Sequence, residues 1–371
     1  MDPKRLVRDR RHALKTPRLE IDLNKIRHNS AAISTMLGLR GISLTGVTKV
    51  MMGEPAVARM MLEGGARFIG DSRLENIQRM IHGGIRADYI LIRSPMLSQV
   101  DEVVSLTHMS FNSEISVIRA LSEAALDQNR CHKILLMVEL GDLREGVLPK
   151  DLAGLVKQTI GLKGVRLAGI GTNLACLSGV MPVQERMVFF SNLVKKVSKR
   201  FSLNLELISG GNSANYTWLT QNYDSGCINN LRMGEMIFTG CNILTGEPVP
   251  CLYQDTIRLV GEVIEFKIKD SKPKGPVVKN AFGQRPKFEN QGRMARAILG
   301  LGRQDVNANG LTPLDDVSII GACSDHLVLD THKFHPPIGH EFKFSLSYGA
   351  LLSAMTSPYV KKVFLARPLK Y

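Results

Sequence analysis

The sequence lacks the features that mark membrane-spanning, secreted and zinc-binding proteins. It has no run of about 18 apolar residues, and its N-terminus has no apolar core typical of a signal sequence. Its six cysteines include no Cys-x-x-Cys pair, which argues against a zinc site and against a disulfide framework. We therefore expect a cytoplasmic protein with no membrane partner, in which most cysteines are buried thiols.

Aromatic residues are scarce, and acidic residues are outnumbered by basic ones. Aromatics make up 6% of the chain, which leaves few platforms for stacking single-stranded bases. The net charge is +14, yet no nucleic-acid-binding motif accompanies it. We expect residues 1–16 to form a basic N-terminal arm, and we expect no nucleic-acid partner. The basic residues of the arm are Lys4, Arg5, Arg8, Arg10, Arg11 and Lys15.

Short apolar segments that are typical of strands recur along the first part of the chain. Segments with helical spacing separate them, and residues 54–62, 113–126 and 183–200 are the clearest of these. Eight parallel strands joined by helices over about 200 residues predict an α/β fold with a TIM barrel rather than an open doubly wound sheet. The predicted strands are residues 43–50, 67–70, 88–93, 108–112, 133–140, 166–173, 205–210 and 230–240.

The sequence pattern changes beyond about residue 245, where short segments rich in β-branched residues alternate with loops of Pro, Gly, Lys and Asn. A barrel domain over residues 17–245 and a C-terminal all-β domain over residues 246–371 are therefore expected. Residues 18–23 are typical of a strand that fits either domain. The segments of the second domain are residues 256–267, 294–299, 316–320, 326–329 and 341–346.

Lys49 lies near the end of the first predicted strand, and a glycine- and serine-rich segment, residues 208–215, follows the seventh. An amine at the mouth of a barrel can form a Schiff base with a carbonyl cofactor. Loops after strands seven and eight are the usual phosphate site of this barrel. Each feature alone has a simple explanation, a solvated lysine and an ordinary turn. Together, on neighbouring strands of a closed barrel, they favour pyridoxal 5'-phosphate as the cofactor.

Motifs along the chain carry a resemblance to a known enzyme family. They are VTKVMMG at 47–53, IGDSRLENI at 69–77, LMVELGDLREGV at 136–147, GIGTNLAC at 169–176, ISGGNSAN at 208–215, LRMGEMIFTG at 231–240, GRQDV at 302–306, GACSDHLVLD at 321–330 and YGALLSAMTSPYV at 348–360. The chain resembles the fold-type III pyridoxal-phosphate enzymes and is most similar to the ornithine racemase branch of the alanine racemase superfamily. The resemblance spans nearly everything beyond the first sixteen residues and implies racemisation of an amino acid.

The resemblance also implies roles for individual residues. Lys49 matches the lysine that holds the cofactor, Arg232 the arginine that faces the pyridine nitrogen, and Arg144 a substrate-side arginine. Because a guanidinium only donates hydrogen bonds, the ring nitrogen opposite Arg232 would stay unprotonated and the ring would be a weaker electron sink, which suits racemisation. Asn173 stands where alanine racemases usually have a histidine. The implied cofactor-binding set is Lys49, Asn173, Ser209, Gly210, Gly211, Asn212, Ser213, Arg232 and Gly234.

Both arginines have simpler alternatives, since Arg232 could form an inter-strand ion pair with Glu235 or another carboxylate, and Arg144 could pair with a carboxylate of its own loop. Two departures from the family pattern concern tyrosines: Gly53 replaces a phosphate-binding tyrosine, and Phe282 a catalytic one. A second acid and base is then expected from residues 323–326 of a partner subunit, which implies a homodimer with shared sites. The catalytic residues proposed on this basis are Lys49, Cys323, Asp325 and His326, and the alternatives for Cys323 and His326 are a buried thiol and a satisfied core histidine.

The sequence is compatible with three functions. A racemase acting by two bases on ornithine, lysine or a related amino acid is favoured. A decarboxylase on the same scaffold is the first alternative, although such enzymes generally place a carboxylate where Arg232 stands. A cofactor carrier is the second alternative, although carriers usually lack the β domain. A cationic substrate tail would require a carboxylate, for which the candidates are Glu75, Glu139, Asp142, Glu235 and Asp325.

Overall fold

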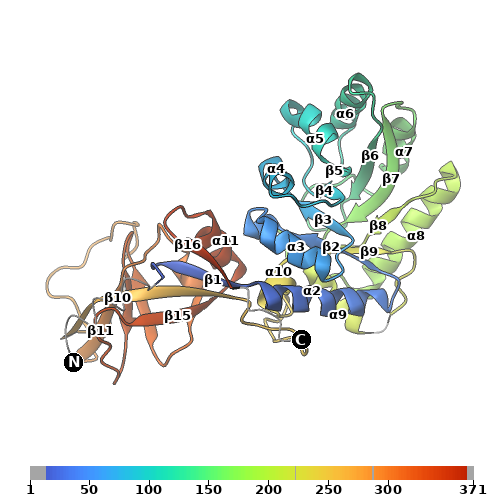
Figure 1. Ribbon diagram of the computed structural model, residues 1–371. Coiled ribbons are helices and arrows are strands. Elements are labelled where there is room, and N and C mark those ends of the chain that lie inside the picture. Colours follow the sequence, from blue (N-terminus) through green and yellow to red (C-terminus); the bar gives the residue numbers. More distant parts are fainter. Residues whose placement is uncertain (1–13, 222, 286–287, 366–371) are drawn as a thin grey trace, which may run out of the picture. The chain divides into compact units, whose positions relative to one another are not determined.

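The computed structural model describes residues 14–221, 223–285 and 288–365, so residues 1–13 of the expected basic arm lie outside the described residues. The chain divides into two compact units (Figure 1). Leu23–Thr256 form the first unit, the barrel unit. Among the described residues, 14–22 join those of 257–365 in the second, the β unit. Residues 246–256 thus belong with the barrel unit, whereas the sequence pattern placed the change near residue 245.

The barrel unit is an eight-stranded, closed, parallel barrel, as predicted, in which β9 returns to pair with β2. Its strands are β2 (Ser43–Val47), β3 (Phe68–Asp71), β4 (Tyr89–Leu91), β5 (Met109–Asn112), β6 (His132–Val138), β7 (Val165–Thr172), β8 (Leu207–Ser209) and β9 (Asn230–Met233). Its α-helices are α2 (Leu23–Gly38), α3 (Pro55–Glu63), α4 (Leu74–His82), α5 (Val100–Leu106), α6 (Ile115–Asp127), α7 (Leu152–Ile160), α8 (Gln184–Phe201), α9 (Tyr216–Thr220) and α10 (Glu235–Thr239). No helix in the described part of the chain is long and apolar enough to cross a membrane.

The helices form where the local sequence dictates. Helix α3 begins at Pro55 because proline suits the first turn, and the Glu54 carboxylate accepts a hydrogen bond from the backbone N–H of Ala56. Helix α8 buries residues spaced three and four apart, including Met187, Phe190 and Val194, on one face. Burying each such side chain stabilises the fold by roughly 1.5–3 kcal/mol.

One predicted strand, residues 230–240, was wrong in its second half. Strand β9 ends at Met233, and α10 begins at Glu235 after Gly234. The run Met236 to Phe238 is buried, and a short buried apolar run looks the same in a strand and in a helix. Similarly, β2 ends at Val47, so Lys49 begins the 3-10 turn η2 (Lys49–Met51) rather than lying on the strand.

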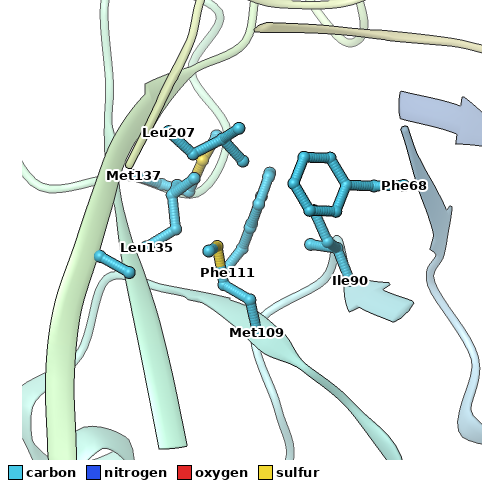
Figure 2. Close-up of a cluster of buried hydrophobic side chains, with 8 residues drawn as sticks. Phe68, Ile90, Met109, Phe111, Leu135, Met137 and Leu207 are labelled. Atoms are coloured by element: carbon cyan, nitrogen blue, oxygen red, sulfur yellow. The ribbon is translucent and has the colours of Figure 1, made fainter. Parts of the chain in front are cut away.

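A cluster of apolar side chains fills the barrel interior (Figure 2). Phe111 is 2% exposed and lies among side chains from the neighbouring strands that point toward one another. This packing fixes the strand ends relative to each other, which a site built on several strands requires. The cluster comprises Phe68, Ile90, Met109, Phe111, Leu135, Met137, Ala168 and Leu207.

The β unit is built on an eight-stranded sheet, as expected for the second domain. Strand β1 pairs antiparallel with β10 and parallel with β16, which assigns it to this unit. The buried Arg18 of β1 forms ion pairs with Glu20 and with Glu341 of β15, each at 2.7 Å. The elements are β1 (Arg18–Asp22), β10 (Ile257–Asp270), β11 (Arg293–Leu299), η5 (Ala308–Gly310), β12 (Leu311–Pro313), β13 (Ser318–Ala322), β14 (Leu327–Asp330), β15 (Glu341–Leu346), α11 (Tyr348–Thr356) and β16 (Lys361–Leu365).

Candidate active site

The carboxyl ends of the eight parallel strands meet at one mouth of the barrel, which is where enzymes of this fold place their chemistry. Lys49 follows β2, Asn173 follows β7, Ser209 ends β8, and Arg232 lies on β9. Because β2 pairs with β9 and β8 with β9, most of the residues proposed from the sequence lie on adjacent strand ends. The barrel topology therefore brings them to the same mouth.

Arg232 is the best-anchored side chain of the mouth. Its Nη1 donates to Ser209 Oγ at 2.6 Å, and its Nη2 donates to Thr172 O and to Asn173 Oδ1, each at 3.0 Å. The guanidinium also lies 5.1 Å from the centroid of the Phe111 ring. The acceptors are neutral oxygens at the ends of β7 and β8. These hydrogen bonds do not form the alternative ion pair with Glu235.

Complete burial lowers the pKa of Arg232 to about 10, and the positive charge of Arg144 acts in the same direction. At neutral pH the guanidinium therefore stays protonated and remains a donor only. The Ser209 hydroxyl that accepts from it donates in turn to Asn230 Oδ1 at 2.8 Å. Ser209, predicted as a cofactor contact, thus also holds the arginine in place.

The segment 209–215 forms a tight turn that joins three strand ends. Asn212 caps η4 (Ser213–Asn215) by accepting from the backbone N–H of Ala214 at 2.7 Å. Its Nδ2 donates to Asn173 Oδ1 at 3.1 Å and to Leu174 O at 2.8 Å. Gly211 has a φ of 145°, and a Cβ there would lie 2.2 Å from Asn215 Oδ1. The predicted anion-binding turn is therefore rigid and tied to β7.

The end of β9 packs tightly on the end of β2. A Cβ at Gly234 would lie 2.7 Å from Val47 O, so only glycine fits there without a shift. Val47 stands two residues before Lys49, and Glu235 follows Gly234. Burial raises the pKa of the Glu235 carboxyl, and the charge of Lys49 opposes that rise. Glu235 thus lies within the electrostatic reach of the Lys49 amine.

A buried polar network supports the turn that carries Lys49. Thr48 Oγ1 donates to Asp71 Oδ2 at 2.7 Å, while Asp71 Oδ1 accepts from Asn76 Nδ2 at 2.9 Å and from Arg73 N at 3.0 Å. Burial raises the pKa of Asp71, although these donors act against the rise. The network fixes the residue before Lys49 to the end of β3.

The loops after β6 and β7 are tied together at Asp142. Its carboxylate accepts from the backbone N–H groups of Cys176, Leu177 and Ser178. Burial disfavours the charged form, but these donors outweigh it and lower the pKa of Asp142. Arg144 pairs with Glu145, Nη2 to Oε1 at 2.6 Å, and donates to Cys176 Sγ at 2.7 Å. The ion pair within the loop, an alternative left open by the sequence, is therefore present.

The proposed second-base segment lies in the β unit, on the turn between β13 and β14. Cys323 Sγ lies 3.4 Å from His326 Nδ1, and the backbone N–H of Cys323 donates to His326 O at 2.9 Å. Both residues are exposed, so neither alternative, a buried thiol or a core histidine, applies. The expectation of mostly buried cysteines was wrong more widely, because Cys131, Cys176, Cys251 and Cys323 lie on surface segments between helices and strands.

Sequence comparison decides the family. Residues 21–241 match the family model described as alanine racemase, N-terminal domain. A lysine racemase of Thermotoga maritima is 37% identical over 94% of this chain and 98% of its own length. An ornithine racemase of Acetoanaerobium sticklandii is 33% identical over 94% of this chain and 99% of its own length. The chain belongs to the alanine racemase family. It is therefore an amino-acid racemase, and the resemblance inferred from the motifs is confirmed.

Structural comparison agrees with the family fold. The alanine racemase of Streptomyces lavendulae superposes with a TM-score of 0.73 at 18% identity, covering 95% of this chain and 98% of that one. A D-threonine aldolase of Filomicrobium marinum reaches a TM-score of 0.71 at 16% identity, covering 92% of this chain and 88% of that one. The barrel and β unit are thus the alanine racemase fold.

Sequence reasoning missed the residues that hold this racemase's site residues in place. Asp71 and Asn76 stood in the IGDSRLENI motif but have no chemical signature of their own there. Asn230 and Phe111 contact the Arg232 network from inside the barrel. A polar residue at the end of an otherwise apolar strand, as at Asp71, is the signal that could have been used.

Proposed function

We propose that this racemase uses pyridoxal 5'-phosphate to interconvert the L and D forms of ornithine, lysine or a related cationic amino acid by a two-base mechanism. The observation that carries the proposal is Arg232, a fully buried guanidinium held at the barrel mouth by neutral oxygens. The two long relatives, named for lysine and for ornithine, support the class of substrate.

The residues at the mouth fit this cofactor. Lys49 would hold its aldehyde carbon, residues 210–213 with Gly234 would hold its phosphate, and Arg232 would face its ring nitrogen. Asn173 Nδ2 is a buried polar atom without a hydrogen-bond partner among the described residues, as expected beside a group that supplies acceptors. When bound, the cofactor withdraws electrons from the substrate's α-carbon and so acidifies its α-proton.

The protein's own groups determine the fate of the acidified α-carbon. Arg232 donates but cannot accept, so it would leave the ring nitrogen of the cofactor unprotonated and make the ring a weaker electron sink. Such a sink would favour return of the proton to the α-carbon over decarboxylation or transamination. Lys49 Nζ takes or returns the α-proton on one face. Arg144, shared with Glu145, is the group that would orient the substrate carboxylate.

The opposite face requires a second acid and base, which we assign to Cys323 and His326 of the partner subunit in a homodimer. They form an exposed thiol and imidazole pair at 3.4 Å, and both side-chain types serve as general acids and bases in enzymes. The Asp325 carboxylate accepts from Gln304 Nε2 at 2.8 Å and from Ser324 Oγ at 2.7 Å. We therefore assign Asp325 to holding the segment rather than to proton transfer. Free cysteines at the surface are also compatible with the proposed cytoplasmic location.

Glu235 is the carboxylate best placed for the cationic tail of the substrate. Glu139 and Asp142 accept backbone N–H groups of their own and neighbouring loops, and Asp325 is held as described. Glu75 is exposed in the first turn of α4. Glu235 combines partial burial with proximity to the charge of Lys49. We therefore assign Glu235 to the second amine of the substrate.

Chiral chromatography of reactions with single L-amino acids tests the activity. We expect D-ornithine or D-lysine to appear, with no release of carbon dioxide. Release of carbon dioxide without a D-isomer would favour the decarboxylase. Binding of the cofactor without either reaction would favour the carrier.

The second base is tested by α-proton exchange in deuterated water, starting from each enantiomer separately. Cys323→Ala and His326→Gln should leave one enantiomer exchanging through Lys49 while the other slows by about 100-fold or more. Asp325→Asn should slow both by less. Near-normal exchange of both enantiomers in Cys323→Ala and His326→Gln would place the second base elsewhere.

A further inference from the structure

The loop 302–304, between β11 and η5, lies against the segment that carries Cys323. The backbone N–H of Arg303 donates to Cys323 O at 2.9 Å, and that of Gln304 donates to Ser324 O at 3.1 Å. A Cβ at Gly302 would lie 2.3 Å from Ser324 O and 2.5 Å from Asp325 N. The two backbones therefore approach so closely that only glycine fits at 302.

The Arg303 side chain extends this contact to a third segment. Its Nε donates to Ala322 O at 3.1 Å, and its Nη2 donates to Gln284 Oε1 at 3.2 Å. The guanidinium lies 3.9 Å from the centroid of the Phe282 ring. Donation in two directions combined with stacking requires a planar, forked cation, so lysine could not replace it fully.

These contacts bear directly on the geometry of the Cys323 and His326 pair. Ala322 O, which accepts from Arg303, belongs to the residue just before Cys323, and Cys323 O accepts from the Arg303 backbone. The thiol faces an imidazole three residues later across a turn closed by the Cys323 N to His326 O hydrogen bond. Without the Arg303 side chain, the backbone just before the turn would lose the hydrogen bond at Ala322 O and keep the one at Cys323 O.

We propose that Arg303 is a positioning residue that holds Cys323 and His326 in proton-transfer geometry. This inference rests on the proposed function, in which that pair supplies the second base. Arg303 acts through the backbone at Ala322 and through the Phe282 ring, and it takes no proton itself, since a guanidinium stays protonated. The pair is thereby fixed before substrate arrives, as general acid-base catalysis requires.

The first test measures the rate at which iodoacetamide alkylates Cys323 in the full-length protein as a function of pH. Peptide mass spectrometry is required because other cysteines are also exposed. Wild type should show a contribution from the paired imidazole that His326→Gln lacks, and Arg303→Met should reproduce the His326→Gln profile. Arg303→Lys should lie between the two. The charged groups near the pair are His326, Asp325, Arg303, Asp305 and, on β10, Glu265.

Arg293→Met is the matched control, because Arg293 is an exposed arginine at the start of β11. It should keep the wild-type alkylation profile. If Arg303→Met also keeps that profile, Arg303 does not position the pair, whatever the identity of the second base. The alkylation result therefore judges the positioning role without using the racemase reaction.

The second test follows α-proton exchange from each enantiomer in Arg303→Met. We expect exchange of one enantiomer to fall on the order of 100-fold, as misplacement of a catalytic group by about 1 Å does, while exchange of the other changes little. A merely structural loss would slow both enantiomers equally, and that result would overturn the inference. If the alkylation profile changes but Cys323→Ala and His326→Gln exchange normally, the positioning role stands and the assigned second base fails.

Discussion

The barrel mouth holds its charged side chain in a buried setting, whereas the Cys323 segment carries its reactive side chains in an exposed one. Arg232 is 5% exposed, and its hydrogen-bond partners come from neighbouring strand ends. Cys323 and His326 are exposed and depend on a loop, an arginine and a ring that is itself 42% exposed. The partners of Arg232 all come from its own chain, whereas Cys323 and His326 lack the water exclusion that makes proton transfer efficient. A second subunit would supply that exclusion.

Lys49→Ala should have the largest effect on this contrast, because the barrel mouth would lose its one proposed covalent anchor. We expect racemase activity to fall on the order of 10⁴-fold or more. Absorbance in the region of roughly 400–430 nm, expected of the cofactor bound to a lysine amine, should disappear. Lys157→Ala, on the exposed face of α7, is the control and should keep both properties. Borohydride reduction should fix the label on Lys49 in wild type, and a colourless wild-type protein after incubation with pyridoxal phosphate would end this assignment.

Substituting one phenylalanine in each region should lower the free energy of unfolding by different amounts. Phe111→Ala should lower the free energy of unfolding by about 3–5 kcal/mol, because it opens a cavity in the barrel core. Phe282→Ala should lower it by less than about 1 kcal/mol, since that ring is half-exposed and loses mainly its contact with Arg303. Urea denaturation of both variants measures the difference. Equal losses would mean that the residue 282 loop is as tightly packed as the barrel.

Arg232→Glu should convert the chemistry of the mouth and leave the Cys323 and His326 pair unchanged. A carboxylate opposite the ring nitrogen would favour its protonation and strengthen the electron sink. We expect cofactor to be retained, racemisation to fall by about 100-fold, and transamination products to appear. Product analysis by mass spectrometry decides the matter, and unchanged racemisation without by-products would show that Arg232 does not face the ring.

The smallest effect concerns acid stability of the barrel. Burial, with a smaller contribution from His108, lowers the pKa of His132 to about 4. The unfolded chain therefore binds a proton that the folded chain refuses between about pH 6.5 and pH 4. The titration of His132 leaves the free energy of unfolding unchanged above pH 6.5 and lowers it by at most about 3 kcal/mol as the pH drops to 4. In His132→Gln the free energy of unfolding should vary less over this range, and identical pH dependence in both proteins would contradict the assignment.

The sequence predicted the features that have a recognisable residue pattern or motif. Eight apolar segments and the positions of Lys49 and Arg232 followed from alternation and motif. Residues 236–238 were misassigned because a short buried run has no distinguishing period. The polar end of β3 marks Asp71 but does not identify Thr48 as its partner, and nothing local marks the contact of Arg303 with Phe282, because such pairs depend on loop paths and side-chain directions.

Strand β1 has a consequence for the order in which the protein is made. It is synthesised before the whole barrel unit, yet its sheet partners begin at Ile257 and Lys361. At about 5–20 residues per second, translation reaches β16 only after some tens of seconds. Leu19 and Ile21, fully buried in the finished sheet, have no sheet partner while residues 23–256 are being synthesised. A nascent chain stalled before residue 257 would therefore display an unpaired apolar strand, the kind of segment that chaperones recognise.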